Sequence, residues 1–227
     1  MNPIVISLEG NIGSGKSTLI KLLKERILKW TFLFEPVEEW MKVKDENGKN
    51  ILDLFYQDKK RWSYTFQNLA FFTRTNQLLK ELSENKIIIS ERSVLTDKNV
   101  FSKILFDQND MNKIEYNNYL MLIEMFDQKV KFHGHIYLKT NVNKTYERIN
   151  KRSRESESEI KIEYLKKLND YHDLWLENKN NVLILDGNNE FETNKEELDN
   201  LVKKIENFIL RLFLENVGLN QLNTKDI

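Results

Sequence analysis

The chain of 227 residues contains no cysteine, only two prolines and only seven glycines. Without cysteine, a disulfide framework and thiolate chemistry are both excluded, and the composition fits a reducing compartment. The scarcity of proline and glycine excludes collagen-like, linker-rich and low-complexity classes. Hydrophobic residues make up 40% and charged residues 31%, which indicates a globular protein, long enough for one domain with a substantial core.

The sequence also lacks an excess charge and a long apolar run. The 35 lysines and arginines balance 35 aspartates and glutamates, which gives no reason to expect a nucleic-acid polymer as a partner. No apolar run approaches the ~20 residues that span a bilayer. The start, Met1-Asn2-Pro3 before an apolar run, has no targeting character. We therefore expect a cytoplasmic protein that has no membrane partner.

Short apolar runs alternate with helical patterns along the chain. The runs are 4–8, 31–34, 87–89, 136–138 and 182–185, and the helical patterns cover 19–30, 62–82, 94–106, 113–130, 144–151, 162–176 and 195–214. This alternation is typical of βα units on a parallel sheet that is buried on both faces. It predicts an α/β fold with a five-stranded parallel sheet flanked by helices, in a single domain over residues 1–216. A polar tail is expected at 217–227.

Three of the seven glycines lie within six residues, directly after the first apolar run. Residues 10–17 read GNIGSGKS, which matches the P-loop pattern G-x-x-x-x-G-K-[ST] between a strand and a helix. The predicted phosphate-binding residues are Gly10, Asn11, Ile12, Gly13, Ser14, Gly15, Lys16, Ser17 and Thr18. Lys16 is expected to reach the β- and γ-phosphates and Ser17 to ligate Mg²⁺. The expected cofactors are therefore ATP, or another nucleoside triphosphate, and Mg²⁺.

Charged residues follow other runs, at the edge where an open α/β sheet binds its ligands. Glu35, beside the rigid Pro36, is a candidate general base. Glu91 is a candidate Mg²⁺ contact, and Arg92 could hold an acceptor oxygen or the moving phosphoryl group. A single carboxylate at a strand end more often only aids solubility. Together with the P-loop, these residues favour phosphoryl transfer to a hydroxyl.

A highly charged segment, RSRESESE, covers residues 152–159. Arg148 and Arg152 are spaced i, i+4 on a helix face, with Arg154 just beyond. Such a cluster can close over a nucleotide and supply positive charge to the transition state, as a lid at about 148–160. The alternative is a solvated basic helix end, which these residues by themselves favour.

Several motifs together resemble the deoxyribonucleoside kinase family. They are ISLEGNIGSGKST, EPVEEW, RWSYTFQ with Arg74 downstream, ERSVLTD, RINKRSR and IEYLKKL, which run in family order from Ile6 to about Phe191. The resemblance implies a P-loop kinase fold with a helical lid. It implies ATP-dependent phosphorylation of the 5′-hydroxyl of a deoxyribonucleoside, a small-molecule partner, which yields the monophosphate for nucleotide salvage. It also implies a homodimer formed through the helices near 62–82 and 112–130.

The same resemblance implies a role for each matched residue. Glu35 would activate the 5′-hydroxyl, Arg92 would assist it, and Glu91 would belong to the Mg²⁺ environment. The lid residues would be Arg148, Arg152 and Arg154, and Glu190 and Phe191 would contact the adenine of the donor. The nucleoside contacts would be Tyr56 and Glu157 at the 3′-hydroxyl, Gln67 at the base edge, Phe66 and Phe101 on the base faces, and Trp40 in the pocket wall. For each aromatic residue, ordinary core packing is the alternative.

The base preference can be read from Arg74 and Asp97. Arg74 lies seven residues after Gln67, on the same helix face. The resemblance associates an Arg–Asp pair with members that act on deoxycytidine or purine deoxynucleosides, and Ala70 resembles the deoxycytidine version of the pocket. The pair can present donors and an acceptor to an amino-substituted base. We therefore expect these nucleosides to be preferred over thymidine, although a plain salt bridge is the alternative.

Two other functions stay open on the sequence alone. A thymidylate or other nucleoside monophosphate kinase shares the fold, but it should favour an arginine for the acceptor phosphate over a base such as Glu35. A nucleotide-binding switch would keep the P-loop without needing Tyr56, Gln67 and Glu157. The three histidines form no convincing metal set. Lys161 stands where the family often has proline, which leaves the timing of the lid and the choice of donor open.

Overall fold

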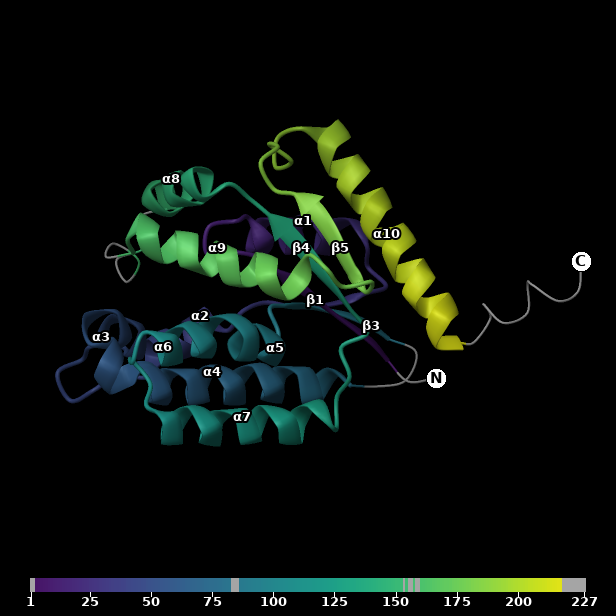
Figure 1. Cartoon of the computed structure of the whole chain (residues 1–227). Helices are drawn as coiled ribbons and strands as arrows, with labels where there is room; N and C mark the ends of the chain where they lie inside the picture. Colours follow the sequence, from purple (N-terminus) through teal and green to yellow (C-terminus); the bar gives the residue numbers. More distant parts are fainter. Residues whose placement is uncertain (1–2, 83–85, 153, 155–156, 158–159, 218–227) are drawn as a thin grey trace, which may run out of the picture.

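The computed structural model describes residues 3–82, 86–152, 154, 157 and 160–217. Five strands form a parallel sheet in the order β2-β3-β1-β4-β5 (Figure 1). The strands are β1 (Ile4–Glu9), β2 (Thr31–Leu33), β3 (Ile87–Glu91), β4 (Gly134–Lys139) and β5 (Val182–Asp186). The predicted five-stranded parallel sheet flanked by helices is confirmed, and each strand lies on one of the five apolar runs.

Helices connect the strands and cover the sheet. The helices before β3 are α1 (Lys16–Arg26), α2 (Val37–Lys42), α3 (Ile51–Gln57) and α4 (Lys59–Glu81). Those after β3 are α5 (Val94–Thr96), the π-helical turn η1 (Asp97–Phe101), α6 (Ser102–Asp107), α7 (Lys113–Asp127), α8 (Val142–Arg152), α9 (Ile162–Leu176) and α10 (Lys195–Val217). In the described residues, no helix has the length and apolar character that a membrane span requires.

The alternation of side chains along β1 explains the layers. Ile4, Ile6 and Leu8 point to one face, where they pack in a core cluster with α1 and α10. Val5 points to the other face and belongs to a cluster with α4 and α7, which lie side by side in Figure 1. Because both faces are covered, the carboxyl ends of the strands form the open edge of the sheet.

Several segments differ from the sequence-based expectation, among them helix α2, which no helical pattern in the sequence indicated. The helix expected at 19–30 begins at Lys16 and ends at Arg26. Helix α3 was not expected, because its N-cap, Asn50, lies in a polar segment that reads as a loop; its side chain accepts hydrogen bonds from two backbone N–H groups of α3. The stretch 94–106 is not one helix, since η1 interrupts it between Asp97 and Phe101. Such π-turns are frequent at functional sites.

The ends of the expected domain are only partly described. Of the predicted lid at 148–160, the structure describes the end of α8 together with Arg154, Glu157 and Ile160. Residues 153, 155–156 and 158–159, and residues 218–227 of the predicted tail, lie outside the described residues. The division into one domain over 1–216 with a tail therefore stays a prediction.

Candidate active site

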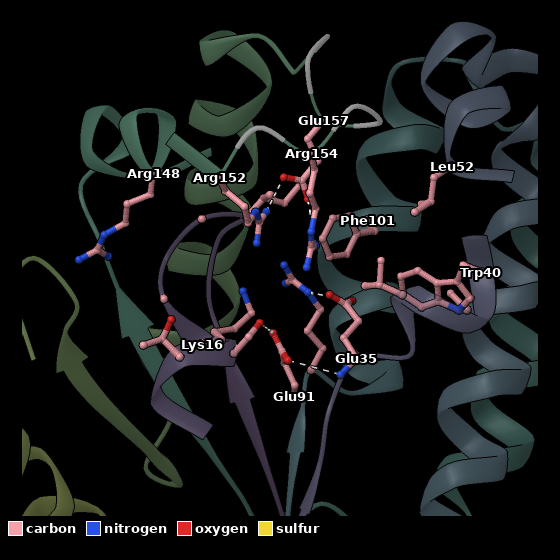
Figure 2. A pocket seen from close by; sticks show the side chains of 18 of the residues that line it. Lys16, Glu35, Trp40, Leu52, Glu91, Phe101, Arg148, Arg152, Arg154 and Glu157 are labelled. Carbon is pink, nitrogen blue, oxygen red and sulfur yellow. Dashed lines mark hydrogen bonds and ion pairs between the residues drawn. The ribbon is translucent and has the colours of Figure 1, made fainter. Parts of the chain in front are cut away.

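A cavity of about 510 Å³ opens at the carboxyl ends of the strands (Figure 2). Every predicted site residue lines this cavity except Gly10, Asn11 and Ser14. The P-loop, the residues that follow β2 and β3, helices α3 and α4, and the end of α8 all contribute to it. Packing therefore gathers residues from Ile12 to Glu192 around one space, and a cavity of this size suits a small-molecule ligand.

The P-loop has the backbone that its glycines permit. Gly13 and Gly15 have φ values of 76° and 99°, which side-chain-bearing residues rarely adopt. A Cβ at Gly13 would lie 2.5 Å from the Thr145 carbonyl oxygen, so the loop packs tightly on α8. Asn11 anchors the loop from outside the cavity, because its Nδ2 donates to the Leu165 carbonyl oxygen at 2.8 Å.

Lys16 is buried at the floor of the cavity. Its Nζ donates to the carbonyl oxygens of Asn11, at 2.7 Å, and Gly10, at 3.1 Å. Burial, together with the nearby positive charge of Arg92, lowers the pKa of Lys16 to about 7, although Glu91 and Glu35 oppose the shift. The P-loop carbonyl oxygens thus hold the Lys16 side chain inside the curve of the loop. Helix α1 begins at Lys16, and the positive end of its dipole points into the cavity.

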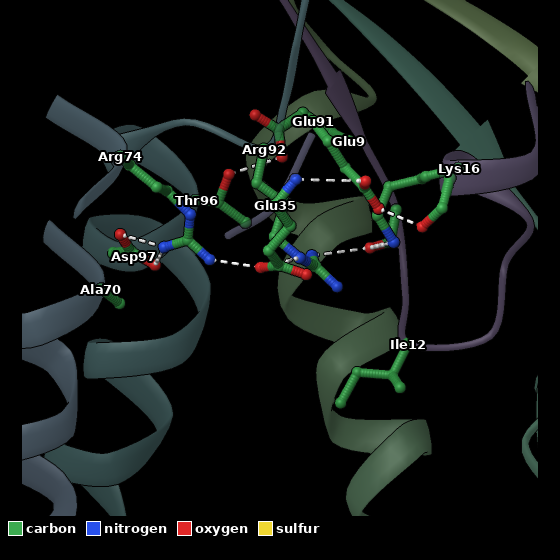
Figure 3. A network of polar contacts seen from close by, with 12 residues as sticks. Glu9, Ile12, Lys16, Glu35, Ala70, Arg74, Glu91, Arg92, Thr96 and Asp97 are labelled. Carbon is green, nitrogen blue, oxygen red and sulfur yellow. Dashed lines mark hydrogen bonds and ion pairs between the residues drawn. The ribbon is translucent and has the colours of Figure 1, made fainter. Parts of the chain in front are cut away.

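Glu35, just after β2, lies between two buried arginines (Figure 3). Arg74 from α4 donates to its Oε1 through Nη2, and Arg92 Nε lies 3.2 Å from the same oxygen. Burial alone would raise the pKa of Glu35, but the charges of Arg92, Arg74 and Lys16 outweigh it and lower the pKa to about 2. The carboxylate is therefore ionised at neutral pH and oriented by charge-assisted contacts.

Ser17 and Glu91 meet beside Lys16. The Ser17 hydroxyl donates to Glu91 Oε1 at 2.7 Å, and the Glu35 backbone N–H donates to Glu91 Oε2 at 3.4 Å. A hydroxyl and a carboxylate are the oxygen donors that Mg²⁺ prefers. The described residues contain no group of three or more histidine, cysteine, aspartate or glutamate side chains suited to a metal ion. The pair thus fits a Mg²⁺ that takes few protein ligands and the rest from phosphate and water.

The other end of the cavity is lined by aromatic rings and one amide. Phe66 packs edge-on against Trp40, with ring centroids 5.2 Å apart, and Phe101 lies under the Arg92 guanidinium. Gln67 is buried, and its Oε1 has no hydrogen-bond partner in the part of the chain that the structure describes. A buried amide oxygen without a partner that lines a cavity is suited to accept a bond from a ligand.

Arg74 and Asp97 form a buried ion pair beside Gln67. Arg74 Nη1 lies 2.6 Å from each carboxylate oxygen of Asp97, and both side chains are almost fully buried. Burial raises the pKa of Asp97 to about 6, while the Arg74 charge opposes the shift. Because Arg74 also contacts Glu35, one guanidinium links the candidate base to the aromatic end of the cavity. The pair is therefore not the plain surface salt bridge that the sequence left open.

Tyr56 from α3 lies at the cavity wall near Glu157, and burial raises its pKa, so the hydroxyl stays neutral. Glu157 in turn accepts hydrogen bonds from two lid arginines, Arg152 at 2.5 Å and Arg154 at 3.4 Å. Figure 2 shows these two arginines above the cavity, on the side opposite Lys16 and Glu91. The structure therefore brings together the residues assigned to the 3′-hydroxyl and part of the lid.

Arg148 lies apart from the other two lid arginines (Figure 2). Its Nη1 donates to the carbonyl oxygens of Ser14, at 3.0 Å, and Gly187, at 3.1 Å, so it joins the P-loop to the loop after β5. In that second loop, Glu190 lines the cavity and Phe191 is buried against Gly15. Arg148 thus belongs to the P-loop end of the cavity and not to the Arg152–Arg154 cluster.

Sequence reasoning missed some lining residues. Val37, Leu52 and Tyr164 also face the cavity. Leu52 lies on α3, which has no clear periodic signal, so nothing in the sequence pointed to it. Tyr164 lies within the motif IEYLKKL and could have been found there, whereas Val37 directly follows Pro36 in the motif EPVEEW.

Known proteins share this arrangement of motifs over nearly the whole chain. The family model of the deoxynucleoside kinases matches residues 6–210. A probable deoxycytidine kinase of fowlpox virus is 38% identical over 92% of this chain and 89% of its own length. A mitochondrial deoxyguanosine kinase of Xenopus laevis is 34% identical over 91% and 90% of the two chains. The deoxycytidine kinase of Homo sapiens is 32% identical over 91% of each chain. The chain therefore belongs to the deoxynucleoside kinase family and is a phosphotransferase that phosphorylates a deoxynucleoside.

Proposed function

We propose that the chain transfers the γ-phosphoryl group of ATP to the 5′-hydroxyl of deoxycytidine or a purine deoxynucleoside, in preference to thymidine. The observation that carries the proposal is the Glu35–Arg74–Asp97 chain of contacts, which runs from the P-loop end of the cavity to its aromatic end. A monophosphate kinase is less well supported, because the cationic groups nearest to Glu35, Arg74 and Arg92, are already occupied by carboxylates or backbone.

Each residue of the phosphoryl end has a proposed task. Glu35 accepts the proton of the 5′-hydroxyl, and Arg92, 3.2 Å from Glu35, holds the acceptor oxygen. Lys16 and the P-loop N–H groups bind the β- and γ-phosphates, and Arg152 and Arg154 approach the migrating phosphoryl group. Ser17 and Glu91 would hold Mg²⁺, which neutralises phosphate charge when it is bound. The low pKa of Glu35 keeps its carboxylate ionised, and therefore able to accept a proton, at neutral pH.

The base preference rests on the chemistry of Asp97 and Gln67. A carboxylate can only accept hydrogen bonds, so Asp97 suits an exocyclic amino group and repels a carbonyl at the same position. Cytosine and adenine carry such an amino group where thymine carries a carbonyl, whereas guanine carries a carbonyl there and offers an amino group only at its C2 position. Gln67, whose Oε1 accepts no hydrogen bond from any described residue, supports contact to the remaining base edge. A thymine carbonyl facing the Asp97 carboxylate would leave two buried acceptors without a donor. This costs binding affinity and therefore disfavours thymidine.

A panel of nucleosides with ATP and Mg²⁺ tests the proposal. We expect a higher kcat/KM for deoxycytidine, deoxyadenosine or deoxyguanosine than for thymidine, and no turnover of the corresponding monophosphates. The variant Asp97→Asn, whose amide can donate to a carbonyl, should raise the ratio of thymidine to deoxycytidine kcat/KM by about tenfold or more. Turnover of monophosphates alone, or a preference for thymidine in the wild type, would contradict the proposal.

We also propose a homodimer formed through α4 and α7. Phe72 and Leu79 on α4 are 56% and 50% exposed, and Met121 and Met125 on α7 are 68% and 53% exposed. These helices pack side by side, and each carries two exposed apolar side chains that a second copy would cover.

A cytoplasmic location is the remaining part of the proposal. The absence of cysteine supports it, because such a chain gains nothing from an oxidising compartment. The relative in Xenopus laevis is named as mitochondrial, so a fluorescent fusion of the full chain, imaged with a mitochondrial marker, is the appropriate test.

A further inference from the structure

The last residue of β1, Glu9, carries a buried carboxyl group for which none of the roles above accounts. Its side chain has no exposed surface. Its Oε1 accepts a hydrogen bond from the Ser93 hydroxyl at 2.8 Å. Its Oε2 accepts one from the Thr96 hydroxyl at 2.5 Å, and Figure 3 labels both Glu9 and Thr96. Within the described residues no lysine or arginine pairs with it. A carboxyl group buried without a cation is costly, so its presence calls for a function.

The two hydroxyls that bind Glu9 also begin a helix. The Ser93 hydroxyl accepts the Thr96 backbone N–H at 3.3 Å, and the Thr96 hydroxyl accepts the Ser93 backbone N–H at 3.0 Å, which makes a capping box at the start of α5. A hydroxyl has only one proton. Because Glu9 accepts the proton of each hydroxyl, both oxygens are left oriented as acceptors toward these N–H groups.

The capping box directly follows Arg92, whose backbone has an unusual conformation. Arg92 has a φ of 62°, in the left-handed region that non-glycine residues seldom adopt. Its N–H donates to the Leu8 carbonyl oxygen at 2.9 Å, and its Nη1 donates to the Gly10 carbonyl oxygen at 2.8 Å. Three consecutive residues therefore hold this turn. Leu8 accepts the backbone N–H of Arg92, Glu9 binds the two hydroxyls of the capping box, and Gly10 accepts the Arg92 guanidinium.

We infer that Glu9 is a positioning residue, which fixes the turn 91–97 through Ser93 and Thr96 and so sets Arg92 against Glu35. The turn begins with Glu91 and ends with Asp97, so a shift in it moves the candidate Mg²⁺ contact, the acceptor arginine and the partner of Arg74 together. The inference rests on the proposed function for the roles of these three residues. It adds a residue that touches neither substrate nor cofactor.

Four variants test the inference with saturating ATP, Mg²⁺ and the best nucleoside of the panel. Thr96→Val keeps the shape of the side chain and removes the hydroxyl, and Glu9→Gln replaces one acceptor with a donor. We expect both to lower kcat about 10- to 100-fold with the KM for ATP nearly unchanged, because misplacing a catalytic group by about 1 Å has effects of this size. Thr96→Ser, which keeps the hydroxyl, should recover most of the lost kcat.

The matched control is Ser7→Ala, which removes another buried hydroxyl from β1. The Ser7 hydroxyl pairs with His135 of β4 at 2.7 Å and not with Ser93 or Thr96, so Ser7→Ala should lower the melting temperature but not kcat. If Glu9→Gln and Thr96→Val behave like Ser7→Ala, losing stability while keeping kcat, Glu9 is only structural and the inference is wrong. If Glu9→Gln does not fold, the kcat of Thr96→Val still distinguishes a positioning role from a purely structural one.

A failure of the proposed function gives a different pattern. If the wild type phosphorylates only monophosphates, the proposed function fails, and the same comparison of kcat with that acceptor still tests Glu9. Crystal structures of the wild type and Thr96→Val give a readout that needs no turnover. We expect Arg92 to lose its bond to the Gly10 carbonyl oxygen in the variant; an unchanged Arg92 would overturn the inference.

Discussion

At the scale of single residues, charge decides what Glu35 can do. A buried carboxyl group would ordinarily hold its proton, but Arg92, Arg74 and Lys16 lower the pKa of Glu35 to about 2. The same arginines fix its direction, since both contact Oε1. The residue is thus ionised and oriented before any substrate binds, as a general base must be, although so low a pKa also makes it a weak base.

The variant Glu35→Gln tests this role. The amide keeps the size of the side chain and one acceptor oxygen but cannot take a proton, so kcat should fall by about 10²- to 10⁴-fold. Binding of ATP, measured by calorimetry, should stay within a few-fold of the wild type. Glu46→Gln, which removes an exposed carboxyl group from the turn after α2, is the matched control and should keep full turnover. Substantial turnover in Glu35→Gln would mean that another group acts as the base.

At the scale of elements, the P-loop is shaped as much by its neighbours as by its own glycines. Gly13 lies against α8, Gly15 lies against Phe191, and Arg148 bridges Ser14 to Gly187. The predicted phosphate-binding loop is therefore in contact with α8, which leads into the predicted lid, and with the loop after β5. Conformational freedom and lack of space both require glycine at position 13.

We predict that Gly13→Ala abolishes ATP binding, whereas Gly48→Ala does not. Both glycines have positive φ values, 76° and 81°, so both variants bear a similar backbone cost of about 1 kcal/mol. Only at Gly13 would the new Cβ collide with backbone, whereas nothing lies within 4 Å of it at Gly48. Calorimetric titration with ATP, with thermal unfolding as a check on folding, measures the difference. Equal binding by the two variants would show that the contact with α8 is unimportant.

The pairing of α4 with α7 leads to a prediction on assembly. Phe72→Lys places a charge in the apolar surface of these helices, so it should shift a dimer to a monomer, as measured by light scattering after gel filtration. Leu174→Lys on α9 is the control, because Leu174 is 81% exposed and lies on another helix. A wild type that is monomeric at micromolar concentration would contradict the proposed dimer, and so would a dimer that Phe72→Lys leaves intact.

At the scale of the whole molecule, burial of His172 links stability to pH. His172 is fully buried in α9, its Nδ1 bonds to the Leu168 carbonyl oxygen at 2.6 Å, and its ring stacks on Tyr137. Burial, aided by the positive charge of Arg92, lowers the pKa of His172 from 6.5 to about 3. The folded protein therefore binds this proton less well than the unfolded chain does.

The pKa of His172 is lower in the folded state than in the unfolded chain. The contribution of neutral His172 to the free energy of unfolding is therefore fully present above pH 6.5 and is lost as the pH falls toward 3. The free energy of unfolding, measured with urea, should fall between pH 6.5 and 5 with a slope approaching about 1.4 kcal/mol per pH unit from this group. His172→Asn should be less stable at pH 7 but lose this part of the slope. The control His133→Asn, at a half-buried position, should keep most of the pH dependence of the free energy of unfolding. Identical slopes in the wild type and His172→Asn would contradict the assignment.

The sequence by itself determined the features that depend on local order. The five short apolar runs predicted the strands, and GNIGSGKS after the first run predicted a phosphate loop, because strand, loop and helix follow one another within a few residues. The carboxyl ends of parallel strands share one edge, so Glu35, Glu91 and Arg92 could be expected there. The roles of the nucleoside contacts came from the resemblance to a family and not from periodicity.

Only the tertiary structure decided which charges meet. Arg74 and Glu35 are 39 positions apart, and Glu9 and Thr96 are 87 apart, so no local pattern predicts either contact. Helix α3 and the π-turn at Asp97–Phe101 likewise depend on caps and packing rather than on a periodic apolar face. Burial strengthens these contacts, because the low dielectric of the interior enlarges the effect of the neighbouring positive charges, which keep Glu35 ionised although burial alone would raise its pKa.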